Sequence, residues 1–185
     1  MKIGLTQRVL LHKGRAYDSI EHGWYSYLQE HTLTYIPNRL DQDFEDLADR
    51  LDALIITGGD DGVLRRNVEL KIATQMMYQK KPILGVCHGC FLLQDVLGGK
   101  IVDIEGHSDT EHSISYFGEM ITVNSHHTLA IKQVHKHGTV LCVDQEGNCE
   151  AWIERNLAGV VWHPERMETA WLPEEIKNLL FKENK

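Results

Sequence analysis

The stretch that decides the fold is Pro82-Ile-Leu-Gly-Val-Cys87-His-Gly-Cys-Phe-Leu-Leu-Gln94. A short apolar run leads into Gly85-x-Cys87-x-Gly89 and then into an apolar helical pattern, which predicts a buried strand, a tight turn and a helix. Small residues are needed at such a turn because its backbone is strained and packs closely on its neighbours. A cysteine held there can act as a nucleophile, and we expect the helix N-terminus to lower the pKa of the Cys87 thiol.

Two other interpretations of this turn stay open on these residues alone. Cys87 can be a small buried side chain at the end of a strand. Cys87 and Cys90 also form a C-x-x-C pair, the spacing of thioredoxin-like redox centres. A further motif is needed to discriminate among the three.

That motif is Gly159-Val-Val-Trp-His163-Pro-Glu165, which predicts a short strand ending in a histidine, with a carboxylate two residues later. Pro164 favours an extended conformation for its predecessor. Side chains two residues apart then point the same way, so Glu165 can orient the imidazole of His163. The other imidazole nitrogen is left free to take a proton from a thiol, an arrangement for which a redox pair has no use.

A third strand, predicted over Ala53–Thr57, runs into Gly58-Gly59-Asp60. A glycine turn leaves a backbone N–H exposed to a ligand, so Gly59 can donate to an oxyanion together with the amide of His88. An ordinary glycine turn is the alternative. The acidic residues that follow, with no Gly-Lys-Ser/Thr, argue against a phosphate loop.

Helical patterns alternate with short apolar runs over the first hundred residues, which predicts right-handed crossovers and a parallel sheet. The stretch from about 110 to 162 reads as strand after strand. We therefore predict an α/β fold with a mostly parallel central sheet, helices on both faces and an antiparallel extension. The predicted helices are 20–30, 44–51, 63–79, 91–97 and 173–182. The predicted strands are 2–6, 33–36, 53–57, 82–86, 120–124, 139–143, 149–153 and 159–162.

The chain has 185 residues with 19 basic and 27 acidic side chains, and we predict one domain over residues 1–185. A net charge of −8 argues against nucleic acid or an anionic membrane as a partner. The aliphatic runs are too short to span a bilayer, and the N-terminus lacks the apolar core of a signal peptide. We therefore expect a cytoplasmic protein whose four cysteines are thiols.

Together, these motifs resemble the class I glutamine amidotransferase family, and the compact layout resembles its γ-glutamyl hydrolase branch. That branch carries an Asn-Ser-x-His element, which Asn124-Ser125-His126-His127 matches. The resemblance covers most of the chain in the same order. It implies a flavodoxin-like amidotransferase fold and a small-molecule γ-glutamyl substrate.

The resemblance also implies roles for individual residues. The catalytic residues that it implies are Cys87 as nucleophile, His163 as base and acid and Glu165 as orienter, with the amides of Gly59 and His88 as oxyanion hole. The residues that it implies for substrate binding are Gly58, Ser125 and His127. For a phosphoramidate substrate, Arg8, Arg15 or the histidines near 107–112 could supply the positive charge. It implies no cofactor, and because the cysteine spacings are not those of zinc sites we predict no metal.

Three shorter stretches are similar to small hydrolases of bacterial capsule clusters, namely 3–8, 106–112 and 146–152. Those enzymes act on γ-glutamyl-CDP-amidate and release glutamate and cytidine diphosphoramidate.

One departure concerns the family pattern G-x-C-x-G-x-Q, whose glutamine helps to bind the glutamyl substrate. Here Phe91 stands at that position, and Gln94 follows one turn later. Either the glutamyl end is held differently or glutamine is a poor substrate.

Two alternatives remain for the function. One is a glutaminase subunit that supplies ammonia to a synthetase partner, and the other is a non-catalytic binding domain on the same fold. The sequence leaves the oligomeric state open, with a homodimer among the states that it allows.

Overall fold

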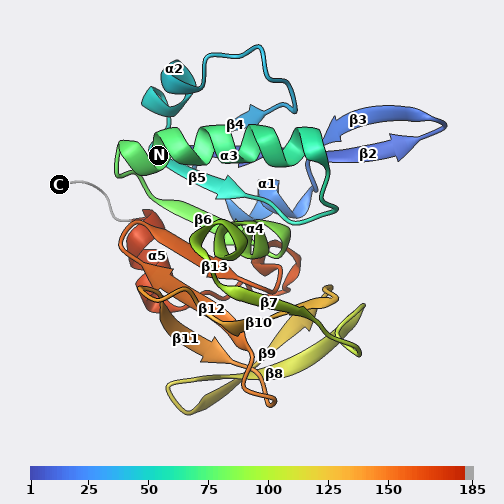
Figure 1. Cartoon of the computed structure of the whole chain (residues 1–185), viewed down its shortest axis with the longest axis vertical. Helices are drawn as coiled ribbons and strands as arrows, with labels where there is room; N and C mark the ends of the chain where they lie inside the picture. Colours follow the sequence, from blue (N-terminus) through green and yellow to red (C-terminus); the bar gives the residue numbers. More distant parts are fainter. Residues whose placement is uncertain (182–185) are drawn as a thin grey trace.

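The computed structural model describes residues 1–181, in which an 11-stranded sheet runs through the molecule (Figure 1). The strand order is β4-β1-β5-β6-β13-β12-β11-β8-β9, with β10 pairing β12 and β7. The first five strands of this order pair in parallel, and every pairing beyond β13 is antiparallel. The predicted α/β sheet with a parallel core and an antiparallel extension is confirmed.

The parallel strands agree with the predicted runs to within a few residues. They are β1 (Lys2–Thr6), β4 (Thr32–Ile36), β5 (Ala53–Ile56), β6 (Ile83–Val86) and β13 (Leu157–Val160). The predicted strand 159–162 is wrong in its bounds, because Val161 and Trp162 are buried by side-chain packing after β13 has ended. An apolar pattern does not distinguish such packing from strand pairing.

The antiparallel extension contains the three predicted strands, β9, β11 and β12, and three strands that were not predicted, β7, β8 and β10. Its members are β7 (Lys100–Asp103), β8 (Thr110–Tyr116), β9 (Glu119–Ser125), β10 (Leu129–Gln133), β11 (Thr139–Val143) and β12 (Cys149–Glu154). β8 shows why prediction failed, since Ile114 is its one buried residue and the rest of the strand is polar or half-buried. Hairpin pairing with β9 across the turn at residues 117–118, rather than an apolar run, makes it a strand.

Helices cover both faces of the sheet, as predicted. They are α1 (Gly23–Tyr27), α2 (Phe44–Asp49), α3 (Val63–Tyr78), α4 (His88–Leu97) and α5 (Glu174–Phe181). Successive residues of a strand point to opposite faces. Ile55 therefore packs in the apolar cluster that includes α1 and α5, while Leu54 and Ile56 pack in the one that includes α2, α3 and α4.

A two-stranded hairpin, β2 (Arg8–His12) and β3 (Arg15–Ser19), projects from the body of the molecule and was not predicted (Figure 1). It buries no side chain completely, so it lacks the apolar face on which a strand prediction relies. Its first residue, Arg8, lies at the carboxyl end of β1.

Within residues 1–181, no helix has the length and apolar character needed to cross a membrane.

Candidate active site

The carboxyl ends of three neighbouring parallel strands deliver the predicted catalytic loops to one edge of the sheet. Cys87 follows β6 directly, the turn at residues 57–60 follows β5, and His163 lies three residues beyond β13. In open α/β sheets this edge is where ligands bind.

Cys87 occupies a strained turn between β6 and α4. Its φ of 50° and ψ of −105° lie outside the regions that non-glycine residues favour. A Cβ atom at Gly85 would lie 2.4 Å from the carbonyl oxygen of Gly89, and a Cβ at Gly89 would lie 2.2 Å from that of Ile56. Both glycines are therefore required for the close packing that the motif predicted.

The thiol of Cys87 is 8% exposed and faces the cavity described below. Burial raises the pKa of this thiol to about 11, although the backbone amide of His88 donates to the sulfur and acts in the opposite direction. The expected lowering of the pKa by the helix N-terminus is therefore wrong, because desolvation of the thiolate outweighs the amide. Such a thiol needs a base to remove its proton.

The imidazole of His163 is paired as predicted. Its Nδ1 lies 2.7 Å from the Oε1 of Glu165, and both side chains are buried. Because a carboxylate accepts, Nδ1 carries the proton and Nε2 is free. The ring lies against the turn after β5, where a Cβ at Gly58 would approach its Cε1 to 2.3 Å. Gly58 thus makes room for the imidazole.

Asn124 of β9 holds the backbone of His163 and was not assigned a role from the sequence. Its Oδ1 accepts from the N–H of His163 at 2.9 Å, and its Nδ2 donates to the carbonyl oxygen at 2.8 Å. The two bonds fix the peptide units on both sides of the histidine. The only signal in the sequence was the position of Asn124 beside Ser125 in the recognised element.

A cavity of about 670 Å³ brings most of the predicted residues together. The predicted residues that line it are Arg8, Gly59, Cys87, His88, His127 and His163. Glu165 lies behind the ring of His163. Ser125 does not line the cavity, because it is fully buried and its hydroxyl donates to the carbonyl of His107 at 2.7 Å.

Phe91 lines the cavity at the position of the family glutamine, and Gln94 does not replace it. Gln94 is fully buried, and its Oε1 accepts from the backbone N–H of His135 at 3.0 Å. Cys90 is also fully buried and accepts from the indole of Trp152 at 3.2 Å. Neither side chain lines the cavity that Cys87 faces.

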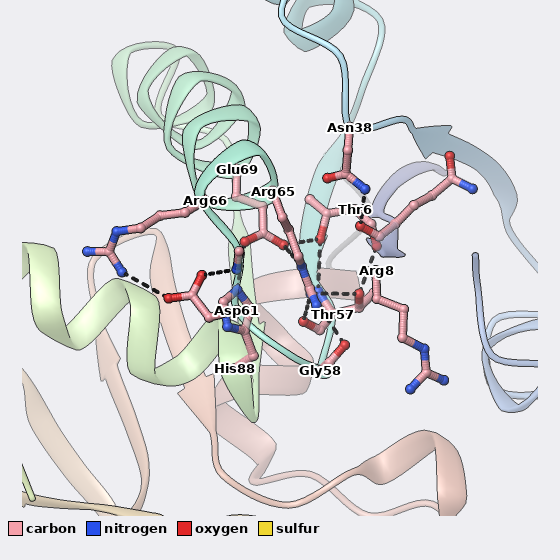
Figure 2. Close-up of polar contacts among 12 residues, drawn as sticks. Thr6, Arg8, Asn38, Thr57, Gly58, Asp61, Arg65, Arg66, Glu69 and His88 are labelled. Carbon is pink, nitrogen blue, oxygen red and sulfur yellow. Dashed lines mark hydrogen bonds and ion pairs between the residues drawn. The ribbon is translucent and has the colours of Figure 1, made fainter. Parts of the chain in front are cut away.

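A buried ionic network, shown in Figure 2, links α3 to the turn after β5 and to the start of α4. Arg65 is fully buried, and its guanidinium donates to the carbonyls of Thr57 at 2.6 Å and Asp60 at 3.1 Å. Its Nε lies 2.8 Å from Glu69, whose other oxygen lies 2.7 Å from the Nε2 of His88. The network holds in place the two segments that carry the predicted oxyanion donors.

Only a weak signal in the sequence pointed to this network. Arg65 and Glu69 lie four residues apart on the stripe of α3 that also buries Val68, Ile72 and Met76. Charged residues on an apolar stripe indicate a buried ion pair, but their partners lie on other elements. Thr6 of β1 completes the set by donating to Glu69 at 2.9 Å.

Two arginines share one carboxylate beside the cavity. Arg8 and Arg166 both line it, and their guanidinium groups lie 2.6 Å and 2.7 Å from the same oxygen of Glu21. Burial alone would raise the pKa of Glu21, but the hydrogen bonds and charges of Arg166 and Arg8 lower it overall. Two cations and one anion leave a net positive charge here. Arg166, one residue past the recognised motif, was not predicted.

Comparisons with known proteins agree with the fold described above. Residues 15–183 match the family model described as glutamine amidotransferase class-I. A γ-glutamyl-CDP-amidate hydrolase of Campylobacter jejuni is 26% identical over 182 residues, which cover 90% of this chain and 90% of that protein. A glutamine-hydrolyzing GMP synthase of Clostridium botulinum is 29% identical over 139 residues, covering 69% of this chain and 27% of the synthase.

Among solved structures, a glutamine amidotransferase from Thermotoga maritima superposes with a TM-score of 0.69. The match covers 89% of this chain and 76% of that one at 12% sequence identity. At such an identity the likeness concerns the fold alone, which is the α/β arrangement described above.

Proposed function

This chain belongs to the class I glutamine amidotransferase family, and we propose that it is a thiol hydrolase acting on a γ-glutamyl amide through a γ-glutamyl thioester. One observation carries the proposal. Cys87, on a strained strand-to-helix turn, and His163, hydrogen-bonded to Glu165, line the same cavity. A nucleophile, a base and an orienter are the three parts that acyl transfer by a thiol requires.

The first half-reaction forms the thioester. The free Nε2 of His163 takes the thiol proton while the sulfur of Cys87 bonds to the γ-carbon. The carbonyl oxygen gains the negative charge and accepts from the amides of Gly59 and His88. His163 then gives its proton to the departing nitrogen, the C–N bond breaks, and the amine or amidate leaves.

The second half-reaction releases glutamate. A water molecule gives a proton to Nε2 of His163 as its oxygen attacks the thioester carbon. The C–S bond breaks, and the imidazolium returns the proton to the sulfur. Glu165 stabilises the imidazolium in both halves, which matters here because the raised pKa of the Cys87 thiol makes its proton costly to remove.

One part of the cavity wall, the arginine pair, supports an anionic substrate, whereas Asp60, Asp61 and Asp95 line the wall elsewhere together with Arg66. Arg8 and Arg166 retain one net positive charge after pairing with Glu21, and a carboxylate or a phosphate oxygen is the complementary group. Phe91 presents a phenyl ring where the family glutamine would donate or accept a hydrogen bond. Glutamine should therefore bind weakly, and recognition should depend on the leaving group.

Within this class we propose γ-glutamyl-CDP-amidate as the substrate, cleaved to glutamate and cytidine diphosphoramidate, with a role in capsule biosynthesis. The Campylobacter jejuni relative covers nine-tenths of both chains, which supports this choice. A diphosphate also suits the arginine pair, and a cavity of about 670 Å³ lies within the range that drug-sized ligands occupy.

A glutaminase subunit that supplies ammonia to a synthetase is the second candidate. The likeness to the amidotransferase part of a GMP synthase favours it. Phe91 counts against it, because a dedicated glutaminase needs to hold the glutamyl end tightly.

The test compares glutamate release from γ-glutamyl-CDP-amidate, a γ-glutamyl alkylamine and glutamine. We expect kcat/KM to be highest for the nucleotide-linked amide and at least about 10-fold lower for glutamine. Turnover of glutamine that appears only when a synthetase partner is added would select the second candidate.

A glutamine-analogue electrophile tests the nucleophile independently. We expect one adduct, on Cys87, and no adduct in Cys87→Ala, while the matched control Cys142→Ala, a buried thiol outside the cavity, is labelled like the unmodified protein. Labelling on Cys90 would restore the redox interpretation. An unlabelled protein that releases no glutamate would indicate a binding domain.

A further inference from the structure

Three histidines and one glutamate meet in the antiparallel extension, away from Cys87, His163 and Glu165, and one of them is His127, which also lines the active-site cavity. They are His107, His112, His127 and Glu150, and one possible ligand atom from each lies within 4.8 Å of those of the others. They come from four segments: the loop after β7, strand β8, the residues after β9, and strand β12. The ring centroid of His107 lies 4.7 Å from that of His112 and 4.9 Å from that of His127.

The polar atoms of this cluster are under-satisfied. Within residues 1–181, the buried side-chain atoms without a hydrogen-bond partner include His107 Nδ1, both ring nitrogens of His112, His127 Nε2 and Glu150 Oε2. The side chains of His127 and Glu150 are each 2% exposed. Buried polar atoms without partners destabilise a fold, so several in one place indicate a missing ligand.

The tautomer of His127 is set for coordination. Its Nδ1 lies 2.7 Å from the carbonyl oxygen of Leu129, and since a carbonyl only accepts, Nδ1 carries the proton. Nε2 therefore presents its lone pair, 4.0 Å from the Oε1 of Glu150. A ring nitrogen that donates to a backbone carbonyl while the other faces inward is the usual outer-shell arrangement of a metal-binding histidine.

The backbone of His107 is also held by hydrogen bonds. Its carbonyl oxygen accepts from the hydroxyl of Ser125 at 2.7 Å and from the backbone N–H of His127 at 3.1 Å. The opposite side of the cluster is set by strand β12, where the Oε2 of Glu150 lies 3.4 Å from the Nε2 of His112. The donors are thus held by different elements and face one another.

We propose that His107, His112, His127 and Glu150 form a binding site for one divalent transition-metal ion, with Zn²⁺ as the best match. Three imidazole nitrogens and one carboxylate oxygen suit zinc in tetrahedral geometry. Around zinc such ligands lie about 3.4 Å apart, so the donors need to approach by roughly 1 Å. Our prediction from the sequence was that no metal is bound, and this proposal replaces it.

The ion would be structural, since four protein ligands leave no open position. The pairing of β8 with β11 is confined to Ser115 and Tyr116, so the other end of β8 is not held by β11. At that end, the ion would connect the β8–β9 hairpin to β12. Asn124, which brackets the backbone of His163, lies on the same hairpin. His107 and His112 also line a second cavity of about 370 Å³, which offers a path for the ion.

Metal analysis of the full chain, purified without a histidine tag, is the direct test. We expect one zinc per chain, removed by a strong chelator and restored by zinc alone. Co²⁺ added to the stripped protein should give the visible absorption of a tetrahedral site without a thiolate-to-cobalt charge-transfer band. A metal-free protein that binds zinc no more tightly than its Glu150→Gln variant would overturn the proposal.

Variants locate the site. His112→Ala and Glu150→Gln should each weaken zinc binding by at least about 100-fold, and circular dichroism checks that they fold. His137→Ala, which removes an exposed imidazole outside the cluster, and Cys87→Ser should bind zinc like the unmodified chain. Full zinc affinity in His112→Ala, or its loss in Cys87→Ser, would contradict the assignment. The cobalt spectrum of the unmodified chain decides the question if the cluster variants do not fold.

Discussion

Two buried clusters of charged and imidazole side chains each contribute one histidine to the wall of the catalytic cavity. In the parallel half, His88 belongs to the network of Arg65, Glu69 and Thr6, in which both oxygens of Glu69 have partners. In the antiparallel extension, His127 belongs to the metal-site cluster proposed above, in which several buried atoms have no partner within residues 1–181.

The two clusters need different partners in order to be stable. Arg65 brings a positive charge opposite Glu69, so the first cluster is complete within the chain. The second contains a carboxylate whose pKa is raised by burial and a histidine, His127, whose pKa burial lowers to about 4. Within the cluster Glu150 faces imidazoles, with the Nε2 of His112 at 3.4 Å, so the proposed metal ion would supply the permanent positive charge that Arg65 supplies in the first cluster.

The largest expected effect comes from the same substitution made in each cluster. Glu69→Gln leaves the Arg65 guanidinium buried without a counter-charge, and we expect it to reduce the free energy of unfolding by about 3–5 kcal/mol. Glu150→Gln in metal-free protein should change it by about 1 kcal/mol at most, because that carboxylate faces the imidazole of His112 at 3.4 Å and not a permanently charged guanidinium. Urea unfolding of both variants measures the contrast, and equal losses would remove the distinction between the clusters.

A double variant tests whether the loss in Glu69→Gln comes from an unpaired charge. Replacing Arg65 and Glu69 together by Leu and Met should cost less than the sum of the two single changes, because no unpaired charge remains. Catalytic turnover should still fall, since the carbonyls of Thr57 and Asp60 lose the guanidinium that positions the Gly59 turn. Unimpaired turnover in a folded double variant would contradict this positioning role.

The next effect concerns Cys87. This residue directly precedes α4, whose first residue, His88, belongs to the first cluster. The pKa of its thiol is raised to about 11 from an unfolded value of about 9. Between these values the unfolded chain loses the proton while the folded chain keeps it, so stability is complete below pH 9 and falls as the pH rises to 11. The loss is roughly 2–3 kcal/mol. Unfolding curves from pH 8 to pH 11 should therefore decline more steeply for the unmodified chain than for Cys87→Ala, and parallel declines would mean that the thiol is not desolvated.

The smallest expected effect concerns Asn124. This residue lies on the β8–β9 hairpin, close to the second cluster in the chain, and holds the backbone of His163. Asn124→Ala removes both hydrogen bonds to the His163 backbone, and we expect kcat to fall about 10-fold with little change in KM. Asn124→Asp keeps the acceptor for the His163 N–H and should recover part of the loss. Steady-state kinetics measures both, and a rise in KM at constant kcat would instead indicate substrate contact.

Much of the fold and of the candidate site follows from local signals in the sequence. The turn around Cys87 was predictable because its glycines, its cysteine and the flanking apolar runs are adjacent in the chain, as are His163 and Glu165. The same holds for the parallel strands, whose buried β-branched runs differ clearly from the helical patterns between them. The family resemblance rested on these same contiguous stretches.

Other features depend on contacts between distant segments, which no local pattern records. The pairing of Arg65 with the turn after β5, the hold of Asn124 on His163, and the meeting of three histidines with Glu150 arise only when the strands take their places in the sheet. The direction of the Cys87 pKa shift was missed for the same reason, because desolvation depends on all the side chains that cover the thiol. Local chemistry thus identified the reacting groups, and tertiary packing decides their charge, orientation and partners.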